Sequence, residues 1–125
     1  MKIDVLEFRL KLYPKYFDRV RAFYADTLGF SVRTEWNDGP AHRGVMFDTG
    51  SGIIELLSDA HQSDGAAYSN DISLRVSNVH AIWEKFKDDE SVIFPIRKND
   101  WGDTSFCIAD PEGFEITFFT PDHNH

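Results

Sequence analysis

Cysteine is nearly absent from this sequence, which has a single one, Cys107, among 125 residues. One cysteine cannot form an internal disulfide, so the fold must depend on its hydrophobic core, as in most proteins of reducing compartments. We therefore expect the protein to be cytoplasmic. Cys107 stands between Phe106 and Ile108 in an expected strand, which favours a structural thiol over a nucleophile.

The sequence also lacks a long apolar run. No stretch approaches the roughly 20 residues that span a bilayer. The first residues, M-K-I-D-V-L-E-F, contain no apolar segment of signal-peptide length. We therefore expect neither membrane insertion nor export.

Clusters of positive charge are missing as well. The 13 Lys and Arg residues are scattered along the chain, and the net charge is −8. Nucleic acids and anionic membranes would be repelled on average, so we expect neither as a partner. Apolar residues make up 42% of the chain, which suits one globular domain of this length.

The sequence repeats its pattern at an offset of 62 residues. Asp48 aligns with Asp110, and the stretch D-T-G-S-G-I-I-E-L-L that begins at Asp48 aligns with D-P-E-G-F-E-I-T-F-F. Each stretch is a group of turn residues followed by an apolar strand. Few residues are identical, but the pattern holds over most of both halves, which indicates two modules of similar structure.

Each half has the pattern of a strand, a helix and three strands, which predicts an α+β domain of two tandem βαβββ modules. Module one covers about residues 1–58, module two about 71–121, and the polar segment 59–70 links them. Alternating apolar runs predict strands, and apolar residues at helical spacing predict helices. The expected strands are 5–13, 30–36, 43–49, 53–58, 71–76, 91–97, 104–109 and 114–120, and the expected helices run from Pro14 to about Thr27 and from Ser77 or Asn78 to about Phe86.

The stretch D-P-E-G at 110–113 separates the last two strands. Pro111 suits the first central position of a type I turn because its ring fixes φ, and Gly113 has the freedom that the last position often needs. We therefore expect a hairpin here, with Thr117 near the middle of its second strand.

Three features together resemble the vicinal oxygen chelate superfamily, which includes glyoxalase I, extradiol dioxygenases, fosfomycin resistance enzymes and bleomycin resistance proteins. They are the two βαβββ modules, F-Y-A-D-T-L-G-F at 23–30 and W-G-D-T-S-F-C-I-A-D-P-E-G at 101–113. The resemblance covers nearly the whole chain and implies curled mixed sheets around a cup. It does not fix the chemistry, because one fold serves many functions.

The resemblance also implies where a metal would bind. Metal-dependent members commonly place four inward His or Glu side chains on the first and last strands of the modules. The corresponding positions in this chain are Arg9, Glu55, Asp71 and Thr117. The internal repeat relates the same positions independently, because the offset of 62 residues connects Arg9 with Asp71 and Glu55 with Thr117.

This set of residues is poor in metal ligands. It has no imidazole, which zinc and iron usually take. A guanidinium about 4 Å from a divalent ion would be repelled by roughly 8 kcal/mol at an effective dielectric near 20, and bonds from Arg9 would occupy the carboxylate lone pairs. We therefore favour no metal cofactor, although Glu55 and Asp71 could hold Mg²⁺ or Mn²⁺ weakly with water as further ligands.

The histidines are not expected to complete a metal site. His42 begins a strand and His80 opens a helix, whereas the others lie in the linker and the tail, namely His61, His123 and His125. All five are expected at the surface, and His42 is the one that a partner subunit could bring near a cup.

Two interpretations of the polar residues stay open. Arg9, Glu55 and Asp71 could form a buried ion network without a function, since buried charges are usually paired. They could instead belong to a ligand pocket, which typically combines an apolar cavity with a few convergent polar groups. The candidate aromatic liners are Trp36, Phe47, Phe94, Trp101 and Phe106, and Trp101, beside Gly102, is expected to be exposed.

We expect a small-molecule-binding protein of the glyoxalase/bleomycin resistance type that is metal-independent and sequesters a drug or a metabolite. An aromatic wall beside carboxylates favours a planar or cationic ligand. The expected ligand-binding residues are Arg9, Glu55, Asp71, Trp101 and Thr117. The alternative is an enzyme, either a metal-dependent lyase, isomerase or dioxygenase with an atypical ligand set or a metal-free enzyme with Glu55 or Asp71 as general base.

The resemblance further implies a homodimer, since many members build each cup across two subunits. Modules could also be exchanged between subunits, with 59–70 as the hinge. A regulatory or scaffold role has no motif in this sequence to support it.

Overall fold

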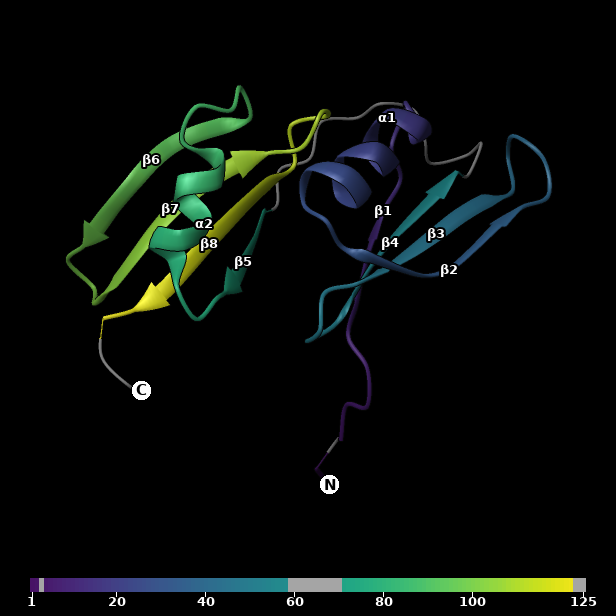
Figure 1. Ribbon diagram of the computed structural model, residues 1–125. Helices are drawn as coiled ribbons and strands as arrows, with labels where there is room; N and C mark the ends of the chain where they lie inside the picture. The colour runs from purple at the N-terminus through teal and green to yellow at the C-terminus, as the bar shows by residue number, and fades with distance from the viewer. Residues whose placement is uncertain (3, 59–70, 123–125) are drawn as a thin grey trace. The chain divides into compact units, whose positions relative to one another are not determined.

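The computed structural model describes residues 1–2, 4–58 and 71–122. They form two compact units, one in each half of the chain (Figure 1). The expected linker at 59–70 and the histidines His61, His123 and His125 lie outside the described residues. That the two modules make a single domain stays a prediction.

The first unit is a four-stranded sheet with a helical segment on one face (Figure 1). Its strands are β1 (Arg9–Leu12), β2 (Ser31–Asn37), β3 (Arg43–Asp48) and β4 (Ile53–Ser58), and its helical segments are α1 (Phe17–Ala22) and the π-helical turn η1 (Phe23–Thr27). The strand order is β1-β4-β3-β2. β1 is parallel to β4, and the other neighbours are antiparallel.

The second unit has the same plan. Its elements are β5 (Asp71–Arg75), α2 (Val79–Phe86), β6 (Val92–Asn99), β7 (Asp103–Ala109) and β8 (Glu115–Pro121). The strand order is β5-β8-β7-β6, with β5 parallel to β8. Asn78 caps α2 by accepting a hydrogen bond from the Ala81 N–H at 3.2 Å. The predicted α+β class and the βαβββ pattern of each half are therefore confirmed.

The repeat extends to the register of the strands. Lys11 pairs with Glu55 in the β1–β4 ladder, and Ser73 pairs with Thr117 in the β5–β8 ladder. Adding 62 to the residue numbers of the first pair gives the residue numbers of the second pair. Because side chains alternate between the two faces of a sheet, Glu55 and Thr117 lie on corresponding faces of their own sheets.

Burial shows which faces these are. In each sheet, alternate apolar residues pack against the helical segment of the unit. The buried strand residues of this kind are Val45, Phe47, Ile54 and Leu56 in the first unit and Phe106, Ile108, Ile116 and Phe118 in the second. Phe47 lies 6.0 Å from Tyr24 of η1 and Phe106 lies 5.2 Å from Trp83 of α2, measured between ring centroids. The suggestion that Phe47 and Phe106 line a pocket is therefore wrong, because both rings are core against a helix. Glu55 and Thr117 lie on the opposite side, which we call the helix-free face.

Most element boundaries lie within two residues of the expected ones; the exceptions are the starts of β1 and of the first helix, which begins at Phe17 and not at Pro14. β1 begins at Arg9 and not at residue 5, because its partner strand β4 begins at Ile53, opposite Arg9. The first helix widens into η1 after α1, with the Leu28 N–H bonded to the Phe23 carbonyl at 3.0 Å. It ends at Thr27, as expected, and Gly29 follows with a φ of 73°. The described residues include no helix with the length and apolar character that crossing a membrane requires.

The D-P-E-G turn forms as predicted. The Gly113 N–H donates to the Asp110 carbonyl at 3.0 Å, and Gly113 has a φ of 89°. The Asp110 side chain also supports the turn, because its buried Oδ1 accepts hydrogen bonds from the N–H groups of Glu112 at 2.8 Å and Phe114 at 3.0 Å.

Replacing Asp110 with Ala is expected to lower the free energy of unfolding by about 1.5–3 kcal/mol, because bonds to a buried charged acceptor are lost. Urea denaturation measures the change. Asp48→Ala is the matched control, since Asp48 accepts from the Gly50 N–H at 2.8 Å in the equivalent turn but is less buried. A smaller loss is expected there, and a loss as large as that of Asp110→Ala would contradict this account of the turn.

Candidate functional site

The residues expected to bind a ligand fall in both units. Arg9 and Glu55 lie in the first, and Asp71, Trp101 and Thr117 lie in the second. Within the first unit, Arg9 and Glu55 are on neighbouring strands and share the helix-free face. Asp71 and Thr117 do the same in the second unit. That these positions meet in one cup stays a prediction.

Glu55 is a buried charged residue of the first unit. Its exposed fraction is 5%, and β1 and β3 flank its strand on both sides. Its Oε1 accepts no hydrogen bond from any described residue. Arg9 Nη1 lies 3.8 Å from this oxygen, which is close enough for attraction but too long for a hydrogen bond. Buried polar atoms are normally hydrogen-bonded, so Glu55 Oε1 is unusual in having no donor among the described residues.

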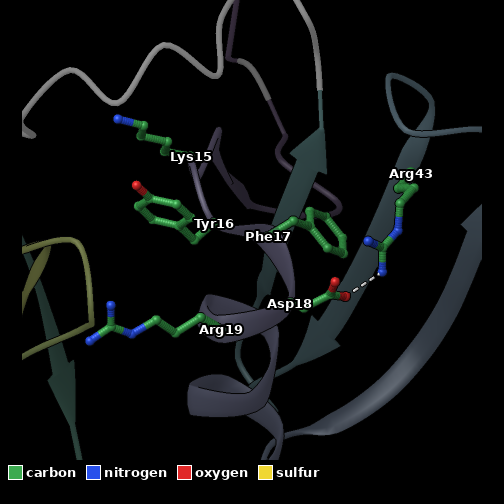
Figure 2. Close-up of a pocket in the computed structure, with 6 residues that line it drawn as sticks. All are labelled: Lys15, Tyr16, Phe17, Asp18, Arg19 and Arg43. Atoms are coloured by element: carbon green, nitrogen blue, oxygen red, sulfur yellow. Dashed lines mark hydrogen bonds and ion pairs between the residues drawn. The ribbon is translucent and has the colours of Figure 1, made fainter.

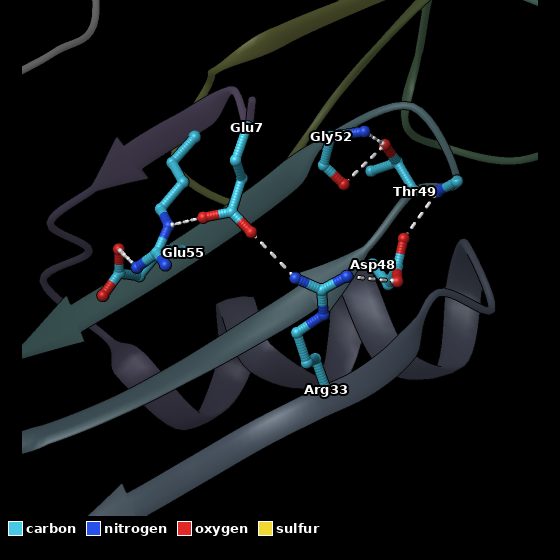
Figure 3. A network of polar contacts seen from close by, with 8 residues as sticks. Glu7, Arg33, Asp48, Thr49, Gly52 and Glu55 are labelled. Carbon is cyan, nitrogen blue, oxygen red and sulfur yellow. Dashed lines mark hydrogen bonds and ion pairs between the residues drawn. The ribbon is translucent and has the colours of Figure 1, made fainter. Parts of the chain in front are cut away.

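The Arg9 side chain bonds to Glu7. Arg9 Nε donates to Glu7 Oε2 at 2.6 Å, and Arg33 Nη1 donates to Glu7 Oε1 at 2.9 Å (Figure 3). Arg33 Nη2 also donates to Asp48 Oδ2 at 3.2 Å. The hydrogen bond from Arg9, and after it that from Arg33, holds the pKa of Glu7 below its usual range.

The sequence analysis missed Glu7 and Arg33. A signal for Glu7 was available, because residues two apart in an extended segment point to the same side, which places Glu7 beside Arg9. No comparable signal existed for Arg33. It lies where the β2–β3 register shifts between Val32 and Thr34, and such a bulge redirects a side chain.

The predicted buried ion network is wrong for two of its three members. The Arg9 side chain is 41% exposed, and Asp71 is also exposed. Both residues belong to edge strands of their sheets, β1 and β5, so their side chains have fewer neighbours. Glu55 alone is buried as expected.

Trp36 supplies an aromatic surface on the same face as Glu55. It is half-buried and pairs with Gly44 across β2 and β3. A Cβ atom on Gly44 would come within 2.0 Å of Trp36 Cζ2, so the indole lies directly over the glycine. Met46, two residues beyond Gly44, pairs with Glu55. The Cα atoms of Trp36 and Glu55 are therefore separated by about 12 Å across the sheet.

On the helix-free face of the second sheet, Thr117 is half-buried and pairs with the buried Cys107. Burial raises the pKa of the Cys107 thiol; the Thr117 hydroxyl opposes this increase, and the Glu115 carboxylate, 3.6 Å from the sulfur, adds to it. A thiol with a raised pKa is a poor nucleophile. Phe94 of β6 pairs with Cys107 on its other side, so this candidate aromatic liner belongs to the same face.

Trp101 is exposed, as expected, with an exposed fraction of 73%. It lies at the tip of the β6–β7 hairpin, where the Gly102 N–H bonds to the Asn99 carbonyl at 3.2 Å. The Cys107–Thr117 pair lies four residues along β7 from the start of that strand, which is about 13 Å. The sheet therefore does not bring Trp101 and Thr117 together.

A shallow pocket of about 480 Å³ opens at the start of the first helix. Its lining residues are Lys15, Tyr16, Phe17, Asp18, Arg19 and Arg43 (Figure 2). Arg43 bonds to Asp18 Oδ1 at 2.6 Å and its guanidinium carbon lies 4.4 Å from the Phe17 ring centroid. None of the residues expected to bind a ligand lines this pocket.

The model of the Glyoxalase/Bleomycin resistance protein/Dioxygenase superfamily matches residues 5–118. The chain belongs to this superfamily. The resemblance inferred from the two modules and the motifs at 23–30 and 101–113 is therefore confirmed. No curated protein sequence matches the chain.

Solved structures of this superfamily have the same fold. A lactoylglutathione lyase from Agrobacterium tumefaciens is 20% identical and aligns over 95% of this chain and 96% of its own, with a TM-score of 0.72. TnmS3, an antibiotic binding protein from Streptomyces sp. CB03234, is 19% identical over 97% and 98% of the two chains, with a TM-score of 0.71. A glyoxalase/bleomycin resistance protein/dioxygenase from Nocardioides is 14% identical over 100% and 88%, with a TM-score of 0.75. At these identities the likeness shows the fold alone.

The residues at the metal positions implied by the superfamily do not suit a metal ion. Each unit supplies one carboxylate, Glu55 or Asp71, and a guanidinium nitrogen of Arg9 lies 3.8 Å from Glu55. Among residues 1–2, 4–58 and 71–122, no group of three or more His, Cys, Asp or Glu side chains could hold a metal ion. His42 and His80 are both exposed.

Replacing Gly44 with Ala is expected to displace the Trp36 indole, because the new methyl group would overlap it. Emission of Trp36 should shift to longer wavelength, and stability should fall by about 1–3 kcal/mol, as for other overpacked sites. Tryptophan fluorescence and urea denaturation measure the two effects. The same substitution in a Trp36→Phe background should leave emission unchanged; a shift that persists there would show that another tryptophan is responsible.

Cys107 is expected to react slowly with iodoacetamide at pH 8, at least about tenfold more slowly than in the urea-unfolded chain. Burial disfavours the thiolate, which is the reactive form, so the rate in the folded protein should rise only at a pH above the ordinary thiol range. Alkylation followed by mass spectrometry measures the rate. Equal rates for the folded and unfolded chains would indicate an accessible thiol with an ordinary pKa.

Proposed function

We propose that this protein binds a small organic molecule on the helix-free face of its first sheet without the help of a metal ion. The observation that supports this most directly is the buried Glu55 Oε1, which has no hydrogen-bond donor among the described residues. Leaving a buried polar atom unpaired is costly, and an N–H or O–H group of a ligand would remove this cost.

Trp36 gives the same face a flat apolar surface. An indole ring binds planar groups by stacking and cations by attraction to its face. Glu55 adds negative charge on the same side of the sheet. The combination favours a planar ligand that carries a positive charge or an N–H group.

The position of Arg9 argues against a metal in this role. Its guanidinium lies 3.8 Å from Glu55 Oε1, so a divalent ion bound to that oxygen would be repelled by a fixed positive charge. The donors required for zinc, several imidazole or thiolate groups, do not occur at the four superfamily positions. We therefore favour binding without a metal cofactor.

Sequestration of a drug or a metabolite fits this site better than a reaction does. TnmS3, with the same fold, is described as an antibiotic binding protein. The alternative is a metal-free enzyme, favoured by the burial of Glu55, because a buried carboxylate can act as a general base. A protein from Agrobacterium tumefaciens with this fold is described as a lactoylglutathione lyase, so the fold also serves an enzyme.

The test is a screen of planar, N–H-bearing compounds by tryptophan fluorescence. A bound compound should quench the emission and be recovered unchanged. Trp36→Phe should remove the quenching, whereas Trp101→Phe should preserve it. Glu55→Gln should weaken binding about tenfold, because the amide oxygen of Gln accepts a hydrogen bond without the negative charge that strengthens it.

Elemental analysis of the purified protein accompanies the screen. Conversion of a compound in proportion to a bound metal at one equivalent per chain would overturn the proposal and indicate an enzyme. Quenching that depends on Trp101 and not on Trp36 would move the site to the second unit.

A further inference from the structure

The helix-free face of the first sheet holds a second feature, the Glu7 carboxylate between two guanidinium groups (Figure 3). Arg9 donates to one carboxylate oxygen at 2.6 Å and Arg33 donates to the other at 2.9 Å. The two arginines come from β1 and β2, the opposite edges of the sheet. These edges are about 14 Å apart at the usual strand spacing, so the two long side chains converge on a point above the middle of the sheet.

Such a pair of guanidinium groups is a suitable site for a carboxylate. Charge-assisted N–H···O bonds are short and strong, and the planar guanidinium suits carboxylate geometry. In this structure the carboxylate belongs to the chain itself, so Glu7 occupies the place that a carboxylate from solution would take.

The segment that carries Glu7 is held weakly by its other side chains. The neighbours Val5, Leu6 and Phe8 have exposed fractions of 73%, 97% and 66%. Their apolar surfaces contribute little to the core, so Glu7 can leave the two arginines without exposing core residues. The Phe8 carbonyl still accepts from the Ile53 N–H at 2.9 Å, which keeps the start of β1 in place.

The charges around the pair restrict the class of ligand. Arg33 also bonds to Asp48 at 3.2 Å, and Arg9 lies 3.8 Å from Glu55. The two arginines therefore lie near three carboxylates, those of Glu7, Asp48 and Glu55. A plain carboxylate in the place of Glu7 would keep this excess of negative charge. A molecule that also carries an ammonium group would remove the excess and would give Glu55 Oε1 the donor that it lacks among the described residues.

We propose that Arg9 and Arg33 form a carboxylate subsite that Glu7 occupies when no ligand is bound, and that the ligand enters by displacing Glu7. The ligand class is a small molecule with a carboxylate and a nearby ammonium or N–H group. Its contact with Glu55 depends on the function proposed above, whereas the carboxylate subsite does not.

The experiment follows the Nε–Hε signals of Arg9 and Arg33 by NMR, assigned with Arg9→Lys and Arg33→Lys variants. Sodium acetate, which lacks an N–H group, tests the carboxylate subsite alone, and sodium chloride at equal ionic strength controls for screening. Acetate should shift both signals more than chloride does. Glu7→Gln should tighten acetate binding about two- to fivefold, the effect of removing an exposed ion pair that competes for the arginines.

Glu35→Gln is the matched control, because Glu35 forms a similar exposed pair with Arg21 Nη2, at 2.8 Å, elsewhere in the first unit. It should leave acetate binding unchanged. An equal response to acetate and chloride, or no effect of Glu7→Gln, would overturn the subsite.

β-Alanine, which has both a carboxylate and an ammonium group, tests the ligand class. It should bind more tightly than acetate, and Glu55→Gln should reduce its affinity to that of acetate. If Glu55→Gln has no effect while Glu7→Gln still tightens acetate binding, the contact with Glu55 is wrong and the arginine subsite stands. The reverse result would overturn the displacement of Glu7 and support Glu55 as a binding residue.

Discussion

The packing of one helical segment against one face of each sheet is the constraint on which the rest of the structure depends. Phe47 in the first unit and Phe106 in the second are fully buried on that side. A slip of one residue in the register would turn such side chains toward the opposite face. The same packing therefore holds Glu55 and Thr117 on the helix-free faces without any contribution from a ligand.

In the first sheet, the face packed against the helix stabilises the fold, whereas one buried oxygen on the helix-free face lowers its stability. A buried carboxylate oxygen without a hydrogen-bond donor lowers stability, and Glu55 Oε1 is in this state among the described residues. Departures from good local chemistry tend to occur at functional sites, where the remaining structure compensates for them. Arg9 moderates the cost by its charge, and it divides its attraction between Glu55 and Glu7.

The sequence was informative wherever local chemistry agreed with the repeat. The turn at Asp110, the cap at Asn78 and the corresponding positions of Glu55 and Thr117 follow from turn preferences, capping and strand alternation. The partner of Arg9 was missed although Glu7 lies within the strand expected at 5–13, where alternation places it on the same side as Arg9. Arg33 could not be placed because a bulge breaks the alternation on which such a prediction rests. Phe47 and Phe106 were named only as candidate liners, and the choice between liner and core stayed open because alternation alone does not tell which face a helix covers.

The parallel pairing of the first and last strands also affects the order in which each unit folds. Arg9 pairs with Ile53 and Asp71 pairs with Glu115. The partner strand of β1 or β5 is therefore the last strand of the same module to be synthesised, so β1 and β5 cannot pair before then. Loop closure over such a separation is slow compared with the formation of the β3–β4 and β7–β8 hairpins. The strand that carries Arg9 is thus synthesised before the other strands of its sheet and is among the last to join it.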